Sequence, residues 1–321
     1  MPRPTGGGGM ARRRTLYLPV MIAAAVVVAC SVALLALSEE EAQAAFPGKN
    51  GRIAYFDRSG SGDDYEIYSM KPDGTDRTLL SGDAANDYAP DISSDGEKIA
   101  FVSLHSGANK IYVMKADGTA ARNLSGSEVG EGGPAWSPDG TEIAFEKDGD
   151  VWVMDADGSN RKNLTKTPPV NGYEVRERDP AYSPDGTEIA FHKETFRPHD
   201  VDLYTISPDG TKLRQVTDFP GKELEPDWSP SGRSLVYVRS TRTSGERIST
   251  VRPDGTGKRP IAQDGYAPVF SPDGKSIAFT RNGDLYEVKS DGSGDPSVVD
   301  GPEGSSELAP DWGPMRTTTA R

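Results

Sequence analysis

The sequence predicts an all-β fold, namely a six-bladed β-propeller built from four-stranded antiparallel blades. Two interleaved repeats predict this fold. In the first repeat, an aliphatic residue follows the glycine of an Asp-Gly turn by six positions, at Gly74/Leu80, Gly118/Leu124, Gly158/Leu164, Gly210/Val216, Gly255/Ile261 and Gly292/Val298. In the second, serines at 93, 137, 183, 229 and 271 open Ser-Pro-Asp-Gly turns or close variants, at intervals of 44, 46, 46 and 42 residues. A period of about 40–45 residues is typical of one propeller blade.

One repeat unit is enough to assign four strands. Residues 135–136 are extended before the turn at 137–140, where proline and Asp-Gly favour a tight reversal. Alternating large and small residues at 143–145 predict the second strand. A turn at Asp148-Gly149 leads to a third strand at 151–154, and a later Asp-Gly turn leads to a fourth strand around Leu164.

The two ends of the repeat array complement each other. The first recognisable strand, at Ile53 and Tyr55, matches the second strands of the other units, whereas Trp312 matches the first-strand aromatic residues. We therefore expect the C-terminal strand to join the first blade, which removes two exposed sheet edges. Tryptophans recur in register, so we expect them to pack between blades: Trp136, Trp152, Trp228 and Trp312.

The first 45 residues predict a signal peptide or a membrane anchor. An apolar run at 16–37 lies between three arginines and three glutamates, an order that leaves the rest of the chain outside the cytoplasm. The run is long enough to span a bilayer, yet Ala42-Gln43-Ala44 resembles a cleavage site, so both alternatives stay open. The predicted domains are residues 1–45 as this segment, 46–315 as the propeller and 316–321 as a tail.

Charge and composition exclude some functions. With 36 basic and 49 acidic residues, the chain has a net charge of −13, which disfavours nucleic acid and favours basic partners or cations. Cys30 is the only cysteine and lies in the apolar run, so residues 46–321 form no disulfide or thiolate metal site. None of the H-E-x-x-H, G-x-S-x-G or Walker motifs occurs. We therefore predict no catalytic residue and no cofactor.

The units Ala-Trp-Ser-Pro-Asp-Gly-Thr-Glu-Ile-Ala-Phe (135–145) and Val-Phe-Ser-Pro-Asp-Gly-Lys-Ser-Ile-Ala-Phe (269–279) closely resemble the WD40-like Pro-Asp repeat of the TolB propeller family. The resemblance covers residues 46–313. It implies a periplasmic or cell-surface propeller that docks protein or membrane partners, here without the TolB N-terminal domain. Some similar propellers are polysaccharide lyases with a histidine-based metal site, for which His192 and His199 are the weak candidates.

Strand direction places the short Asp-Gly turns on one face of the propeller and the uneven connections on the other face, where binding is expected. Acidic residues lie three positions before a first-strand proline at Asp87, Glu131, Glu177, Glu223 and Glu307. Others directly follow a proline at Asp91, Asp227 and Asp311. We expect these two sets to ring the mouth of the central channel and attract a basic peptide or a cation. The alternative is that each carboxylate accepts hydrogen bonds from backbone N–H groups of its own connection.

Three functions are consistent with these patterns. The first is a scaffold for a protein or peptide partner that is basic or membrane-associated, with no nucleic-acid role. The second is a metal-dependent carbohydrate-active enzyme, and the third is a purely structural envelope protein. Membrane association is expected only through the N-terminal apolar run, if that run is not cleaved.

Overall fold

The computed structural model describes residues 46–58, 64–82, 85–105, 107–128, 130–170, 172–196, 199–241, 245–299 and 308–316. Contacts divide the chain into Met1–Glu41 and Ala42–Arg321, and the described residues all belong to the second unit. The predicted signal or anchor segment lies outside the described residues. Within the described ranges, no helix has the length and apolarity needed to cross a membrane.

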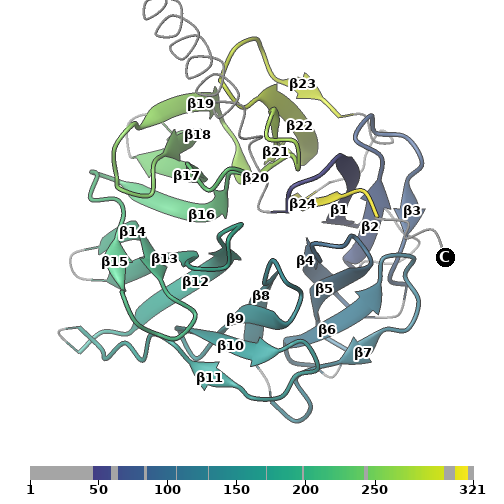
Figure 1. Cartoon of the computed structure of the whole chain (residues 1–321), viewed down its shortest axis with the longest axis horizontal. Coiled ribbons are helices and arrows are strands. Elements are labelled where there is room, and N and C mark those ends of the chain that lie inside the picture. The colour runs from purple at the N-terminus through teal and green to yellow at the C-terminus, as the bar shows by residue number, and fades with distance from the viewer. Residues whose placement is uncertain are drawn as a thin grey trace, which may run out of the picture. The chain divides into compact units, whose positions relative to one another are not determined.

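The described strands form six blades around a central axis (Figure 1). The innermost strands are β24 (Leu308–Pro314), β4 (Asp87–Ile92), β8 (Glu131–Trp136), β12 (Val175–Tyr182), β16 (Lys222–Trp228) and β20 (Tyr266–Phe270). The second strands are β1 (Asn50–Asp57), β5 (Lys98–Ser103), β9 (Glu142–Lys147), β13 (Ile189–Phe196), β17 (Leu235–Thr241) and β21 (Ser276–Arg281). The third strands are β2 (Glu66–Met70), β6 (Lys110–Lys115), β10 (Asp150–Asp155), β14 (His199–Ile206), β18 (Gly245–Val251) and β22 (Asp284–Lys289). The outer strands are β3 (Thr78–Leu79), β7 (Arg122–Asn123), β11 (Lys162–Asn163), β15 (Arg214–Gln215), β19 (Arg259–Gln263) and β23 (Ser297–Val298).

The predicted fold class is therefore confirmed, including the way in which the two ends of the array meet. The strand order of the first blade is β24-β1-β2-β3. Strand β24 pairs antiparallel with β1, so that Ile53 lies opposite Trp312 and Ala54 lies opposite Asp311. One parallel bridge, Val201↔Lys222, also links β14 of the fourth blade to β16 of the fifth.

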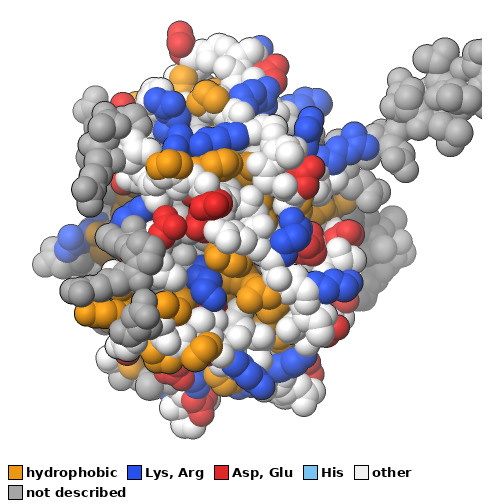
Figure 2. All heavy atoms as spheres, turned by 90° about the vertical axis from the view of Figure 1, so that its left-hand side faces the viewer, with side chains coloured by type: hydrophobic (Ala, Val, Ile, Leu, Met, Phe, Trp, Pro, Cys, Tyr) orange, Lys and Arg blue, Asp and Glu red, His pale blue; other side chains and the backbone are white. Residues whose placement is uncertain are grey.

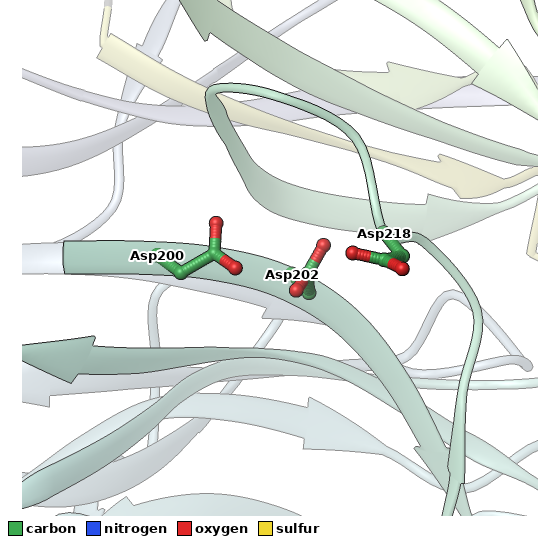
Figure 3. Close-up of side chains that lie close together, drawn as sticks. All are labelled: Asp200, Asp202 and Asp218. Atoms are coloured by element: carbon green, nitrogen blue, oxygen red, sulfur yellow. The ribbon is translucent and has the colours of Figure 1, made fainter. Parts of the chain in front are cut away.

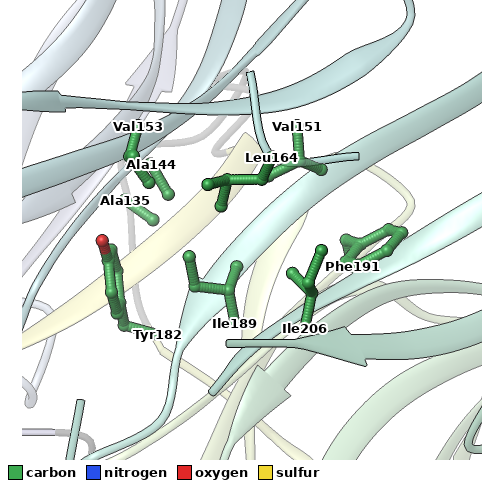
Figure 4. Close-up of a cluster of buried hydrophobic side chains, with 9 residues drawn as sticks. All are labelled: Ala135, Ala144, Val151, Val153, Leu164, Tyr182, Ile189, Phe191 and Ile206. Atoms are coloured by element: carbon green, nitrogen blue, oxygen red, sulfur yellow. The ribbon is translucent and has the colours of Figure 1, made fainter. Parts of the chain in front are cut away.

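Hydrophobic layers between neighbouring blades make up the core. Figure 4 shows the layer between the third and fourth blades, where side chains from both blades face each other. Its buried members are Ala135, Ala144, Val151, Val153, Leu164, Tyr182, Ile189, Phe191 and Ile206. Burying one aliphatic or aromatic side chain of this size contributes roughly 1.5–3 kcal/mol. Each blade is thus stabilised mainly by its two neighbours.

The tryptophans of the innermost strands lie in these layers, as predicted. Trp136, Trp228 and Trp312 are at most 4% exposed. Trp136 packs with residues of the second blade such as Ile111. Trp152 lies on a third strand and is only partly buried, so it contributes less to the packing between blades.

The Ser-Pro-Asp-Gly unit recurs because its copies form the same local hydrogen-bond network. In the third blade, the Ser137 hydroxyl donates to Asp139 Oδ1 at 2.7 Å and accepts from the backbone N–H of Glu142 at 2.9 Å. The backbone N–H of Gly140 donates to the carbonyl of Ser137 at 2.9 Å. The same network recurs at Ser183 and Ser271. These turns therefore have a structural explanation.

The other repeat consists of the glycine of an Asp-Gly turn and the aliphatic residue six positions later. This repeat is explained by contacts between neighbouring blades. Gly118 has a φ of 83°, and a Cβ there would lie 2.6 Å from the carbonyl oxygen of Leu80 in the preceding blade. Gly158 stands in the same relation to Leu124, also at 2.6 Å. Any larger residue would push neighbouring blades apart, so glycine is required at this position.

Candidate functional site

A central channel of about 210 Å³ is enclosed by the innermost strands. Its wall contains one proline from each blade, at Pro90, Pro134, Pro180, Pro226, Pro268 and Pro310. The residue before each proline has a positive φ between 41° and 53°, at Ala89, Gly133, Asp179, Glu225, Ala267 and Ala309. The pairing register of the innermost strands shifts around these positions, so each strand carries a β-bulge there. A bulge redirects side chains, and these bulges place the residues around each proline on the channel wall.

Asp91, Asp227 and Asp311 line this channel. Each carboxylate accepts a hydrogen bond from a backbone N–H of the next blade, and the donors are Trp136 at 2.7 Å, Phe270 at 2.9 Å and Ile92 at 2.6 Å. Burial raises the pKa of Asp227 to about 7 and that of Asp311 to about 6. Burial, followed by the charge of Asp311, also raises the pKa of Asp91 well above its usual value. The three residues thus join blades and give the channel an acidic lining.

A second group of polar residues lies where the channel meets the connection face, the face that carries the uneven connections. Glu146 Oε1 accepts the backbone N–H of Asp179 at 2.9 Å, and Asp179 Oδ2 lies 3.1 Å from His192 Nδ1. Glu225 Oε2 accepts the backbone N–H of Ala267 at 2.6 Å. Burial, with the nearby charge of Asp179, raises the pKa of Glu146 and that of Glu225 to about 7. Burial also acts to raise the pKa of Asp179, but the hydrogen bond and charge of His192 outweigh it and lower that pKa.

His192, one of the two weak metal-site candidates, is 5% exposed. The side chain of His199 lies outside the description. The sequence could not show that His192 would meet Asp179, because the two residues come from neighbouring strands β13 and β12.

The carboxylates of the predicted outer ring, which are those three positions before a first-strand proline, do not lie where they were expected. Asp87, Glu131, Glu177 and Glu223 are at most 1% exposed. Glu131 accepts from the Ser125 hydroxyl at 2.5 Å and pairs with Arg161. These carboxylates are therefore not open at the channel mouth, because the bulge in each innermost strand changes the direction of the side chains that precede it. Glu307, the remaining member of the predicted ring, lies outside the described residues.

Glu177 shows the same kind of pairing in the next blade. It accepts from the Thr167 hydroxyl at 2.6 Å, and its Oε1 lies 2.9 Å from Lys193 Nζ. The partners are side chains of the preceding connection and of the adjoining strand. The alternative expectation, hydrogen bonds from the backbone of each connection, does not describe these pairs either.

A cleft of about 680 Å³ opens beside the channel mouth, between the third and fourth blades. Its lining combines acidic and basic side chains, including Glu146, Lys147, Asp148, Glu174, Arg176 and Arg178. The volume falls in the range of about 300–1,000 Å³ that is usual for ligand pockets. No single sequence motif marks this cleft, because its residues come from five separate segments.

A further acidic group lies away from the channel. Asp200 and Asp202 project from β14, and Asp218 projects from the connection that leads to β16 (Figure 3). The structure brings Asp218 close to Asp200 and Asp202, whereas the candidate metal ligand His192 lies against Asp179. The edge of the ring that carries β14 and β15 faces the viewer in Figure 2, where acidic and basic side chains are interspersed.

Comparison with known proteins now places the chain in a family. The sequence profile of the TolB beta propeller domain matches residues 42–316. The chain belongs to this TolB beta propeller family. It is 29% identical over 97 residues to the Tol-Pal system protein TolB of Nitratidesulfovibrio vulgaris, a match that covers 26% of this chain and 20% of that protein. The chain thus spans about a fifth of that relative.

Solved structures agree with the TolB beta propeller fold. The crystal structure of TolB from Acinetobacter baumannii has a TM-score of 0.70 and 20% sequence identity, covering 83% of this chain and 67% of that one. An oligogalacturonate lyase in complex with manganese is less similar, with a TM-score of 0.51 and 15% identity over 79% of this chain and 73% of that chain. At these identities the likeness is one of fold.

Proposed function

We propose that this TolB-family propeller acts outside the cytoplasm and binds a protein or peptide through its connection face. The observation that carries the proposal is the acidic group at the channel mouth, formed by Glu146, Asp179 and Glu225. These side chains lie beside a cleft of about 680 Å³ and above a channel lined by further aspartates. A group of neighbouring carboxylates attracts ligands of the opposite charge. A lysine or arginine side chain of a partner is therefore the group that this mouth would recognise.

Two further observations support this function. The Tol-Pal system proteins named TolB are relatives of this chain, and that name denotes membership of a multi-component system. The apolar run at 16–37 follows arginines, as in exported proteins. Attachment to a membrane would depend on that run alone. The carboxylates predicted as the outer ring, such as Glu131 and Glu177, would act through their electric field because they are buried.

The proposal is tested with the full-length chain purified in detergent and a fluorescein-labelled peptide of alternating lysine and glycine. Fluorescence anisotropy measures its binding to the wild type and to Glu146→Gln and Glu225→Gln, each of which removes one charge from the mouth. We expect both variants to bind the peptide several-fold more weakly. Glu97→Gln is the matched control, because Glu97 is exposed and directly follows the Ser-Ser-Asp-Gly turn at 93–96 on the opposite face.

Two results would contradict the proposal. One is equal binding of a peptide in which glutamate replaces lysine. The other is an equal loss of affinity in Glu97→Gln, because the effect would then come from net charge rather than from the channel mouth.

The other two functions have less support. A manganese-dependent lyase is suggested by the fold likeness to oligogalacturonate lyase, but His192 is buried and its Nδ1 already lies 3.1 Å from Asp179. Release of unsaturated products from polygalacturonate with Mn²⁺ present, and its loss in His192→Ala, would favour the enzyme. A purely structural envelope protein would respond in neither assay.

A further inference from the structure

We propose that Asp200, Asp202 and Asp218 bind one calcium ion at the junction of the fourth and fifth blades, beside the buried carboxylate of Glu223. The ligand oxygens of Asp200, Asp202 and Asp218 all lie within 4.8 Å of one another. Asp200 and Asp202 are two residues apart on β14, so they project from the same face of the strand, and Asp218 points toward them from the following connection (Figure 3). This site is separate from the channel, and the proposal does not rest on the proposed function.

Glu223 provides the second, independent indication of a ligand. Its side chain is 0% exposed, and neither carboxylate oxygen has a hydrogen-bond partner among the described residues. The nearest cationic atom is Arg239 Nε at 3.5 Å, which is longer than a hydrogen bond. Glu223 lies close enough to Asp202 that the two carboxyl groups interact directly. A buried carboxylate is stable only when it is paired, protonated or bound to a metal.

Asp202 is already held in place for such a role. Its Oδ2 accepts from the Gln215 side-chain amide at 2.9 Å, and its Oδ1 lies 3.3 Å from the Thr217 hydroxyl. Thr217 in turn accepts the backbone N–H of Leu203 at 2.8 Å. Each carboxylate oxygen keeps a free lone pair, because a carboxylate has about four acceptor positions. Groups that orient a ligand in this way are common around metal sites.

The equivalent junctions of the same protein neutralise their glutamate with protein cations. At the junction of the second and third blades, Glu131 pairs with Arg161, and Lys147 Nζ lies 3.9 Å away. At the next junction, Glu177 has Lys193 Nζ at 2.9 Å. Among the described residues, three carboxylates lie within 4.8 Å of one another only at the junction of the fourth and fifth blades. Arg239 and Lys258 lie near Glu223, but these two cations face the carboxyl groups of Glu223 and three aspartates, so an excess of negative charge remains for an external cation.

The repeat also shows where a cation fits. In the second blade Phe101 pairs with Tyr112, and in the fourth blade Phe191 pairs with Tyr204, so these two tyrosines occupy equivalent positions. Lys110 and Asp202 each lie two residues before their tyrosine and are therefore equivalent as well. Lys110 Nζ donates to the carbonyl of Gly126 at 2.7 Å. Gly126 follows Ser125 just as Asp218 follows Thr217. A lysine ammonium group thus occupies, in one blade, the place that a metal ion would occupy in another.

The ligand chemistry favours calcium. All three candidate ligands are carboxylates, and Ca²⁺ takes six to eight oxygen ligands in irregular geometry, whereas Mg²⁺ demands a regular octahedron. Asp218 is exposed and Asp200 is partly exposed, so water can complete the shell and the ion can enter. Calcium would join β14 to β16, which already share the parallel bridge Val201↔Lys222. An ion that binds only the folded chain raises its stability.

The test uses the full-length chain in detergent and terbium, which replaces calcium in oxygen-ligand sites and emits when a nearby tyrosine is excited. Tyr204 follows Asp202 by two residues on β14. Burial, and after it the nearby charges of Asp202, Asp200 and Asp218, raise the pKa of Tyr204. We expect sensitised terbium emission that CaCl₂ displaces, and a melting temperature that rises with calcium concentration. Asp218→Asn, at an exposed position, should weaken calcium binding about tenfold or more.

Two control variants separate this site from others. Asp295→Asn removes the same charge from an exposed position in the sixth blade and should bind calcium like the wild type. Asp227→Asn alters the channel and should also keep terbium emission. Equal binding by Asp218→Asn and Asp295→Asn would overturn the proposal. So would loss of emission in Asp227→Asn with retention in Asp218→Asn, because the ion would then lie in the channel.

Discussion

Asp227 accepts a hydrogen bond from the backbone N–H of Phe270 at 2.9 Å, and this bond joins the fifth blade to the sixth across the channel wall. Asp91 and Asp311 make the same bond to the blades that follow them. The aspartates therefore have two roles, since the bond that fixes them is structural while their charge faces the channel. Their recurrence at the position after proline is explained by the first role.

The first prediction separates these roles at Asp227. Asn keeps an acceptor for the N–H of Phe270, whereas Ala leaves this partly buried donor without its partner, which typically costs about 1–3 kcal/mol. We expect Asp227→Ala to lower the free energy of unfolding by this amount, and Asp227→Asn to lower it less. Urea unfolding followed by tryptophan fluorescence measures both variants. Equal stability of the two variants would contradict the role assigned to this hydrogen bond.

The second prediction concerns pH. Burial raises the pKa of Asp227 to about 7, whereas an aspartate in an unfolded chain titrates near pH 3.9. Between these values the folded state binds more protons than the unfolded state, so stability falls as pH rises from about 4 to 7. Asp227→Asn removes this contribution. The melting temperature of the variant minus that of the wild type should therefore increase from pH 5 to pH 8, and a difference that does not vary with pH would contradict the raised pKa.

Much of the fold could be predicted from the sequence because a repeated unit repeats its structural requirements. Ser137 and Gly118 recur since every blade needs the same turn and the same close contact with its neighbour. The position of Trp312 was sufficient to predict that the last strand joins the first blade, because first strands carry an aromatic residue in register. These features depend on local chemistry, which a sequence displays directly.

The orientation of the acidic side chains could not be predicted in the same way. Asp87 and Asp91 are four residues apart, which places them on one face of a regular strand. The bulge at Ala89 inserts one extra residue, so Asp87 is buried between blades while Asp91 lines the channel. Ala89 has a φ of 50° directly before proline, where sequence rules favour an extended backbone. This backbone conformation depends on the packing of the six blades around the channel, which local sequence rules do not describe.

The third prediction follows from the proposed function. The pKa of Glu146 and that of Glu225 are raised to about 7, first by burial, so both carboxylates lose their charge as the pH falls below that value. The lysine-containing peptide should therefore bind several-fold more weakly at pH 5.5 than at pH 8, at constant ionic strength. Fluorescence anisotropy measures the effect. In Glu225→Gln the pH dependence should be smaller, and an unchanged dependence would show that other groups control binding.

The fourth prediction tests the strand that completes the first blade. Trp312 is 4% exposed and packs with Ile53 and Tyr55 of that blade. Replacing a buried tryptophan by alanine typically costs about 3–5 kcal/mol. Trp312→Ala should therefore lower the free energy of unfolding far more than Trp152→Ala, since Trp152 is only partly buried. Chemical denaturation compares the two variants, and similar losses would argue against a central role for the C-terminal strand.

The fifth prediction concerns the pair of Arg161, directly before the outer strand β11 of the third blade, and the buried Glu131 of the innermost strand β8. Removing one partner of a buried pair leaves an uncompensated charge, which typically costs about 3–5 kcal/mol. Arg161→Met should therefore destabilise the protein strongly, while the double variant Arg161→Met with Glu131→Gln should recover much of the loss because the unpaired charge is gone. A double-mutant cycle measured by urea unfolding gives the coupling energy. If the two single losses simply add in the double variant, Lys147 Nζ, 3.9 Å from Glu131, and the Ser125 hydroxyl are sufficient to hold the carboxylate without Arg161.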